Sequence, residues 1–289
     1  PLVVINGAGG GSVVIDQMLA ANSQSTSLFA NMTFIGFISL IAWGLGYVGQ
    51  PHILARFMAV ESPLKLISAR RIAMSWMIIV LIGSVSTGLA GIAYFVDQPL
   101  ANPETVFIAL SQSLFNPWVA GIITAAILSA IMSTIDSQLL VSSSVIGEDF
   151  YRVFVHPNAS EKELLLVSRI AVIVIALLAL TIASDRDSRV LDLVSYAWAG
   201  FGASFGPVIV FSLFWRRMTA LSAVAGIVIG AATVVVWSNL SGGIFDLYEI
   251  VPGFLFASVA IAVISALKPE RNDLTLKKYD DVQGLLVVS

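Results

Sequence analysis

Polar side chains gather within one long apolar stretch, at residues 129–144, which read SAIMSTIDSQLLVSSS. Helical spacing of three to four residues places Ser129, Ser133, Asp136 and Ser137 close to one face, and Ala130 and Thr134 adjoin it. Neighbouring hydroxyls and a nearby carbonyl are hard oxygen ligands that suit a small alkali cation. The alternative is that the hydroxyls bond carbonyls of their own helix or hold a neighbouring helix. Asp136 favours a site, because a carboxylate within an apolar span needs a partner or a cavity.

A second unusual stretch, residues 43–51, reads WGLGYVGQP. Three glycines and a proline fall within these nine residues: Gly44, Gly46, Gly49 and Pro51. Such a run predicts a bent or locally unwound helix. Trp43 and Tyr47 are four residues apart, so they share a helix face and would wall a small cavity. The alternative is an aromatic belt at a membrane interface, next to a helix end.

Small residues are concentrated in a third stretch, residues 195–207, which read SYAWAGFGASFGP. Gly202 and Gly206 have the spacing that lets two membrane helices approach closely, and Gly226 and Gly230 repeat it further along. We expect all four glycines to serve helix packing.

The elements that carry these residues are membrane helices. The chain has 289 residues, of which 57% are hydrophobic and 11% charged, with a mean hydropathy of +0.92. A soluble domain is about a quarter charged, so this composition predicts an integral membrane protein embedded in the lipid bilayer. The net charge of −3 excludes a nucleic-acid-binding protein, which needs a basic face. The absence of cysteine excludes disulfides and zinc–thiolate sites.

Seven stretches are long and apolar enough to cross a membrane as helices, which predicts an all-α, polytopic fold. They are residues 32–50, 72–95, 118–145, 164–183, 191–215, 219–238 and 250–267. The third is long enough to tilt or bend. Between the second and third, the sequence VFIALSQSLF suggests a short helix at the membrane interface.

Positive charge predicts the orientation of these spans, because cytoplasmic loops retain Lys and Arg. Thirteen of the fifteen fall on one side: Arg56, Lys65, Arg70, Arg71, Arg152, Lys162, Arg169, Arg216, Arg217, Lys268, Arg271, Lys277 and Lys278. Only Arg186 and Arg189 fall on the other side. We therefore expect residues 1–31 to hold the end of a preceding helix and an outer loop, residues 32–267 the helical bundle, and residues 268–289 a cytoplasmic tail.

Three segments carry a resemblance to a known family: WGLGYVGQPHILARFMA, AILSAIMSTIDSQLLVSSSVIGEDFYR and LVSYAWAGFGASFGPVIVFSLFWRRMT, at residues 43–59, 126–152 and 193–219. The chain resembles the solute:sodium symporter family of bacterial inner membranes, and within it the branch that transports proline. The resemblance covers nearly all of the chain from about residue 30. It implies the last seven of the family's thirteen helices, on a leucine-transporter-like inverted-repeat fold.

The resemblance also implies which residues bind. The carbonyl of Ala130 and the hydroxyls of Ser133 and Thr134 would be ligands of Na⁺, the coupling ion, and no organic cofactor is implied. Trp43, Tyr47 and Pro51 would lie on the substrate side of an L-proline site. Arg56 follows in the same motif.

An early helix with the family's essential aspartate has no counterpart in this sequence, and Asp136 is not to be equated with that residue. The chain starts PLVVINGAGGG, without methionine, at what resembles the tail of an earlier apolar segment. We therefore expect a fragment that works with a missing N-terminal half of the same transporter.

Three other functions compete with sodium-coupled L-proline symport by alternating access. A symporter of the same family for pantothenate, a sugar or a monocarboxylate is the nearest, and residues 43–51 argue against it. A seven-helix receptor or light-driven pump would need a lysine inside a predicted span, and there is none. A membrane-embedded protease lacks support because neither HExxH nor GxGD is present and both histidines, His52 and His156, fall outside the predicted spans. We expect no enzyme activity.

Overall fold

In a computed structural model, every regular element of the described chain is a helix, so the all-α prediction is confirmed. The described residues are 1–7, 10–21, 23, 24, 27, 30, 32–184 and 189–288. They fall into two compact units, each treated by itself below. Unit 1 comprises Pro1–Asn31 and Glu61–Asp136, and unit 2 comprises Met32–Val60 and Ser137–Ser289.

Six of the seven predicted spans are present in the described residues as helical runs long and apolar enough to cross a membrane: Leu64–Tyr94, Pro117–Val155, Glu161–Ala183, Val190–Phe214, Ala220–Trp237 and Ile250–Leu267. The seventh is present if the pair Phe34–Gly49 and Pro51–Met58, bent by 50° between its two parts, counts as one span. The chain is therefore a multi-pass membrane protein by the length and composition of its helices.

The helices extend beyond the apolar stretches, because polar residues continue a helix once it leaves the lipid. Helix α5 (Pro63–Tyr94) begins nine residues before the predicted start, and its first turn contains Lys65. Helix α8 (Glu161–Ala183) contains Lys162 in its first turn, and His52 lies in α4 (Pro51–Met58). These residues lie in the helices but outside the predicted apolar spans, so the helices are longer than the spans that were predicted from hydropathy.

The third span is also longer than predicted. Helix α7 (Pro117–Ser144) continues without interruption into η3 (Val145–Val155), which has the wider π-helical turn. Together they form a run of 39 residues. At its end, Tyr151 Oη donates a hydrogen bond of 2.7 Å to Glu163 Oε1 on α8, and His156 Nδ1 lies 2.9 Å from the same oxygen.

Unit 1 is built around α5. Helix α1 (Leu2–Gly7) and α6 (Val106–Leu114) pack on it through Val4, Ala90 and Leu110, and α2 (Gly11–Ala21) packs on it near Ala93. The short helix predicted for VFIALSQSLF, between the second and third spans, is therefore present as α6, and a 3₁₀ turn, η2 (Pro103–Thr105), precedes it. Helix α2 was not predicted, because its eleven residues are too short for a span.

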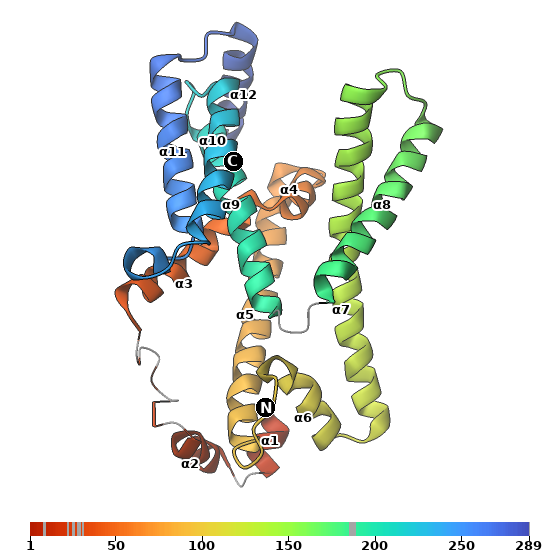
Figure 1. Cartoon of the computed structure of the whole chain (residues 1–289), viewed down its shortest axis with the longest axis vertical. Helices are drawn as coiled ribbons and strands as arrows, with labels where there is room; N and C mark the ends of the chain where they lie inside the picture. The colour runs from red at the N-terminus through yellow and green to blue at the C-terminus, as the bar shows by residue number, and fades with distance from the viewer. Residues whose placement is uncertain are drawn as a thin grey trace. The chain divides into compact units, whose positions relative to one another are not determined.

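The core of unit 2 is formed by α9 (Val190–Phe214), α10 (Ala220–Trp237) and α11 (Ile250–Leu267), which lie side by side (Figure 1). Glycines permit the contact, as predicted. A Cβ on Gly230 would lie 2.4 Å from the carbonyl oxygen of Ala203, and one on Gly226 would lie 2.6 Å from Ile261. A buried hydrogen bond of 2.9 Å from Ser265 Oγ to Ser222 Oγ joins α11 to α10.

Helix α12 (Asp273–Val288), which was not predicted, lies in the expected tail and contacts the turn between α9 and α10. Arg216 donates from Nε and Nη2 to the two carboxylate oxygens of Asp280, at 2.8 and 2.9 Å. These hydrogen bonds, with the charge of Arg216, hold the pKa of Asp280 below its ordinary value. Gln283 Nε2 donates to the carbonyl of Leu213 at 2.6 Å.

Candidate functional site

The first candidate region is the break between α3 and α4, in the bent pair of helices that comes first in the chain. It is here called the α3–α4 break (residues 43–51). Helix α3 (Phe34–Gly46) tightens into a 3₁₀ turn, η1 (Tyr47–Gly49), and Gln50 then adopts an extended conformation with φ −80° and ψ 116°. Pro51 starts α4 at the first helical position, where its missing N–H costs nothing. The bent, locally unwound helix predicted from the glycines and the proline is therefore present.

Two of the three glycines in the break are required by packing. A Cβ on Gly46 would lie 1.9 Å from Trp198 Nε1, and one on Gly49 would lie 2.4 Å from the carbonyl oxygen of Phe201. A Cβ on Gly44, by contrast, would meet no atom within 4 Å. Close approach of α9 therefore explains Gly46 and Gly49, whereas nothing in the structure explains Gly44.

Trp43 and Tyr47 share a face, as predicted, and both contact Trp198 of α9. The Trp43 and Trp198 rings are stacked, with centroids 5.6 Å apart and planes at 16°, and Tyr47 meets Trp198 edge to face at 4.8 Å. Tyr248, just before α11, stacks on Trp43 at 6.1 Å. These four residues, Trp43, Tyr47, Trp198 and Tyr248, form the aromatic cluster. Pro51 lies at the end of the break and is half-buried.

A cavity of about 640 Å³ lies beside the aromatic cluster and is lined by Trp43 and Tyr248, but not by Tyr47. Asp192, Ser195 and Glu249 contribute polar groups to its wall. Burial raises the pKa of Tyr248, and the charge of Glu249 raises it further, so the phenol keeps its proton. Tyr248 Oη then donates a hydrogen bond of 2.7 Å to the carbonyl of Ser195. The volume lies in the range that small-molecule sites occupy.

Arg56, on α4 beyond the break, is directed to the polar stretch of α7. Its Nη2 donates a hydrogen bond of 2.8 Å to Ser137 Oγ, and both residues belong to unit 2. Ser137 was predicted to share a helix face with Ser133, one turn earlier. The contact therefore joins a residue of the break's motif to the part of α7 that belongs to unit 2.

The second candidate region is the hydroxyl segment of α7 (residues 130–134). Ser133 Oγ and Thr134 Oγ1 both donate to the carbonyl oxygen of Ala130, at 2.9 and 3.2 Å. Of the three oxygens that the resemblance assigns to Na⁺, the two hydroxyl oxygens thus lie within hydrogen-bond distance of the third, the carbonyl oxygen of Ala130. The same two hydrogen bonds are also expected from the alternative stated above, in which the hydroxyls bond carbonyls of their own helix and bind no ion. Ser129 precedes the segment on the same helix.

Asp136 lies in the same helix, and its side chain is exposed in the described chain. Among the ion pairs of the described residues, none includes Asp136. The structure therefore shows no partner for the carboxylate, and the prediction of a partner or cavity gains no support here.

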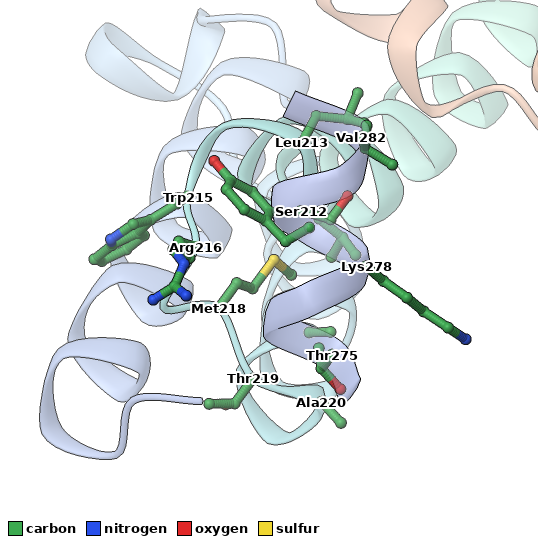
Figure 2. Close-up of a pocket in the computed structure, with 13 residues that line it drawn as sticks. Ser212, Leu213, Trp215, Arg216, Met218, Thr219, Ala220, Thr275, Lys278 and Val282 are labelled. Carbon is green, nitrogen blue, oxygen red and sulfur yellow. The ribbon is translucent and has the colours of Figure 1, made fainter. Parts of the chain in front are cut away.

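A separate cavity of about 380 Å³ lies between α12 and the turn that joins α9 to α10. Its lining includes Met218 and Val282, and Figure 2 shows the side chain of Lys278 extending away from the other labelled residues. None of the predicted site residues lines it. We therefore place the candidate site at the α3–α4 break and on α7, and not at this cavity.

Three residues of the first region were missed by sequence reasoning: Gln50, Trp198 and Tyr248. Gln50 is 4% exposed, and its Nε2 donates at 3.3 Å to the carbonyl of Trp198. Gln50 and Trp198 lie in the two glycine-rich segments, residues 43–51 and 195–207. A large polar or aromatic side chain among small residues is the feature of the sequence that could have identified them. Tyr248, in a predicted outer loop, gave no such signal.

The fold places this chain in the class of helical, multi-pass membrane proteins that have one broken span. Comparison with known proteins identifies the family within that class. The model of the sodium:solute symporter family matches residues 1–230. A sodium/proline symporter of Haemophilus influenzae is 54% identical over 275 residues, which cover 91% of this chain and 55% of that protein.

Two further relatives agree. A sodium/proline symporter of Escherichia coli is 51% identical over 98% of this chain and 57% of its own length. The osmoregulated proline transporter OpuE of Bacillus subtilis is 45% identical over 99% of this chain and 59% of its own length. The chain thus spans a little over half the length of these relatives. It belongs to the sodium:solute symporter family, a family of transporters and not of enzymes.

Proposed function

We propose that this chain is part of a sodium-coupled symporter of L-proline. The observation that carries the proposal is the 54% identity over 91% of the chain to a sodium/proline symporter, in a chain whose broken span exposes an aromatic cluster beside a cavity. No bond is made or broken in such transport. The inward sodium gradient drives the solute across the membrane.

On the ion side, the carbonyl of Ala130 and the hydroxyls of Ser133 and Thr134 are the proposed ligands of Na⁺. Hydroxyls that now donate to Ala130 would rotate and present their lone pairs to the ion. Neutral oxygens give modest affinity, which suits an ion that must be released into the cytoplasm. Further ligands would come from outside this segment.

On the solute side, Trp43, Tyr47 and Pro51 are the proposed contacts of L-proline. Flat aromatic rings suit the apolar face of a pyrrolidine ring, and a break in a span leaves backbone groups for the charged ends of an amino acid. Sodium binding would raise the affinity for L-proline, and linkage makes this coupling reciprocal, typically about 1–3 kcal/mol. Alternating access would proceed by rocking or gating of helix groups on a leucine-transporter-like inverted-repeat fold.

We further propose that transport requires the part of the relatives' length that this chain does not match. The experiments below therefore use a transporter that contains such a part, called the full-length transporter. We place it in a bacterial cytoplasmic membrane with its C-terminus in the cytoplasm. A reporter enzyme that is active only outside the membrane, fused after residue 289, should be inactive.

The test is uptake of labelled L-proline by the full-length transporter in proteoliposomes, with and without an inward sodium gradient. Ser133→Ala and Thr134→Ala should each raise the half-saturating sodium concentration about tenfold, the effect expected when a hydrogen-bonding ligand is lost. Unlabelled pantothenate, a sugar and acetate should not compete. If the wild type takes up no L-proline under any gradient, the substrate is wrong. If both variants behave as wild type, the hydroxyls are not ligands.

A further inference from the structure

One side chain of α9, Trp198, makes three separate contacts with the α3–α4 break. Its indole Nε1 donates a hydrogen bond of 2.9 Å to the carbonyl of Trp43. Its ring stacks on Trp43 and meets Tyr47 edge to face. Its own carbonyl accepts from the amide of the buried Gln50. A single residue thus contacts both proposed aromatic ligands and the end of the break.

The hydrogen bond to Trp43 ties α9 to the last turn of α3. Trp43 lies in that turn, ahead of the 3₁₀ turn η1. Its carbonyl oxygen has two lone pairs and can accept from a side chain as well as from its own helix. The indole N–H of Trp198 donates to it and so holds the backbone at a residue that lines the cavity.

The break is shaped to admit this indole. A Cβ on Gly46 would lie 1.9 Å from Trp198 Nε1 and 2.2 Å from its Cδ1, so only glycine leaves room for the ring. Gly202, on the next turn of α9, in turn has Gly46 Cα 2.7 Å from where its own Cβ would be. The two backbones approach closely enough for the indole to reach past α3's last turn.

We propose that Trp198 is a positioning residue for solute binding: it donates to the carbonyl of Trp43 and sets the orientation of the Trp43 and Tyr47 rings. The inference rests on the proposed function for its consequence, which is affinity for L-proline. Because the rings are held before the solute arrives, binding does not have to order them. Loss of the indole therefore weakens binding and leaves the later steps of transport unchanged.

The experiment compares Trp198→Phe and Trp198→Leu with wild type in the full-length transporter. Phenylalanine keeps an aromatic face and loses the N–H, whereas leucine loses both. We expect the KM for L-proline to rise about fivefold in Trp198→Phe and further in Trp198→Leu, with the maximal rate per transporter retained, which is the signature of lost binding. A merely structural role would instead lower the amount of folded transporter without changing KM.

Ser265→Ala is the control. Ser265 Oγ donates a buried hydrogen bond of 2.9 Å to Ser222 Oγ within unit 2, and neither residue lines the cavity beside the aromatic cluster. The control loses a hydrogen bond between two helices away from the cavity, so its KM should stay within about twofold of wild type. An equal rise in KM in Ser265→Ala and Trp198→Phe would overturn the specific role of Trp198.

A readout without solute separates this inference from the proposed function. Gly44 has open space at its Cβ position, and this chain has no cysteine, so Gly44→Cys provides a reporter thiol in the break of a full-length transporter whose other cysteines, if any, are replaced by serine. Its rate of maleimide labelling should rise when combined with Trp198→Phe and stay constant with Ser265→Ala. If no L-proline is taken up but labelling follows this pattern, positioning holds and the substrate assignment fails. Unchanged labelling together with unchanged KM would overturn the proposal.

Discussion

The α3–α4 break packs against other helices of its own unit, whereas two hydroxyls of the hydroxyl segment of α7 donate to a carbonyl of their own helix. At the break, Trp198 of α9 donates to the carbonyl of Trp43 and accepts from the side chain of Gln50. Tyr248, just before α11, stacks on Trp43. In the hydroxyl segment, Ser133 and Thr134 turn to Ala130 three and four residues earlier. If the two regions bind as proposed, the difference teaches that a solute site and an ion site need different amounts of tertiary support.

The reason lies in what each region has to present. Large rings present a surface only when their orientation is fixed, and fixing them requires packing from several elements. A hydroxyl rotates about one bond, so a helix alone can present it, and an ion then draws the oxygens together. The break is therefore expected to be sensitive to volume, and the hydroxyl segment to the loss of an oxygen.

The largest expected effect comes from adding volume at the break. Gly49→Ala would place a Cβ 2.4 Å from the carbonyl oxygen of Phe201, a backbone atom that cannot rotate away. Overpacking of this kind costs about 1–3 kcal/mol or more, so L-proline uptake should fall at least about tenfold. Gly44→Ala, which meets open space, should keep uptake within about twofold. Equal losses in the two variants would remove the packing argument.

A smaller effect is expected where the break's motif meets α7. A double-mutant cycle of Arg56→Gln and Ser137→Ala measures the hydrogen bond of 2.8 Å between them. Hydrogen bonds to charged groups contribute about 1.5–3 kcal/mol, and the exposure of Arg56 reduces that to about 1 kcal/mol or less here. The coupling energy, obtained from thermal unfolding of the purified transporter, should have that size. Strict additivity of the two substitutions would show that the contact contributes nothing.

The hydroxyl segment should contribute still less to folding. Ser133→Ala and Thr134→Ala each remove an exposed hydroxyl that bonds its own helix, so without sodium the free energy of unfolding should change by less than about 0.5 kcal/mol. Sodium should then raise the midpoint of thermal unfolding of wild type more than that of either variant. A large loss of stability in sodium-free buffer would place these hydroxyls among packing residues, against the comparison.

The smallest effect on transport is expected at α12. Asp280 has a lowered pKa, so its pairing with Arg216 is fully present above the ordinary carboxyl pKa of about 3.9 and is lost as the pH falls below it. Asp280→Asn should release α12 at neutral pH, measured as faster proteolysis between α11 and α12. Uptake should stay near wild type, because neither candidate region uses this ion pair. Protection that is identical in wild type and variant from pH 7 to pH 3 would refute the docking role.

Local features of the sequence determined much of this protein. Long apolar runs fix the seven spans, because lipid requires backbone hydrogen bonds to close within each helix. Three glycines and Pro51 fix the place of the break, and the spacing of Gly226 and Gly230 fixes where helices approach. Hydropathy did not predict where polar residues continue a helix: Lys65, Lys162 and His52 lie in helices that extend past the apolar stretches. It also did not predict α2 and α12, whose segments are too short or too polar for a span.

Only the tertiary structure decided which side chains meet at the break. Trp43 and Trp198 are 155 residues apart in sequence, and Tyr248 and Ser39, joined by a hydrogen bond of 3.0 Å, are 209 apart. Hydropathy and glycine spacing describe one helix at a time, so they cannot say which neighbouring side chain donates to the carbonyl of Trp43. That depends on how α9 and α11 dock on α3. The sequence alone determined where a span had to break, and the packing of distant helices decided how the break is held.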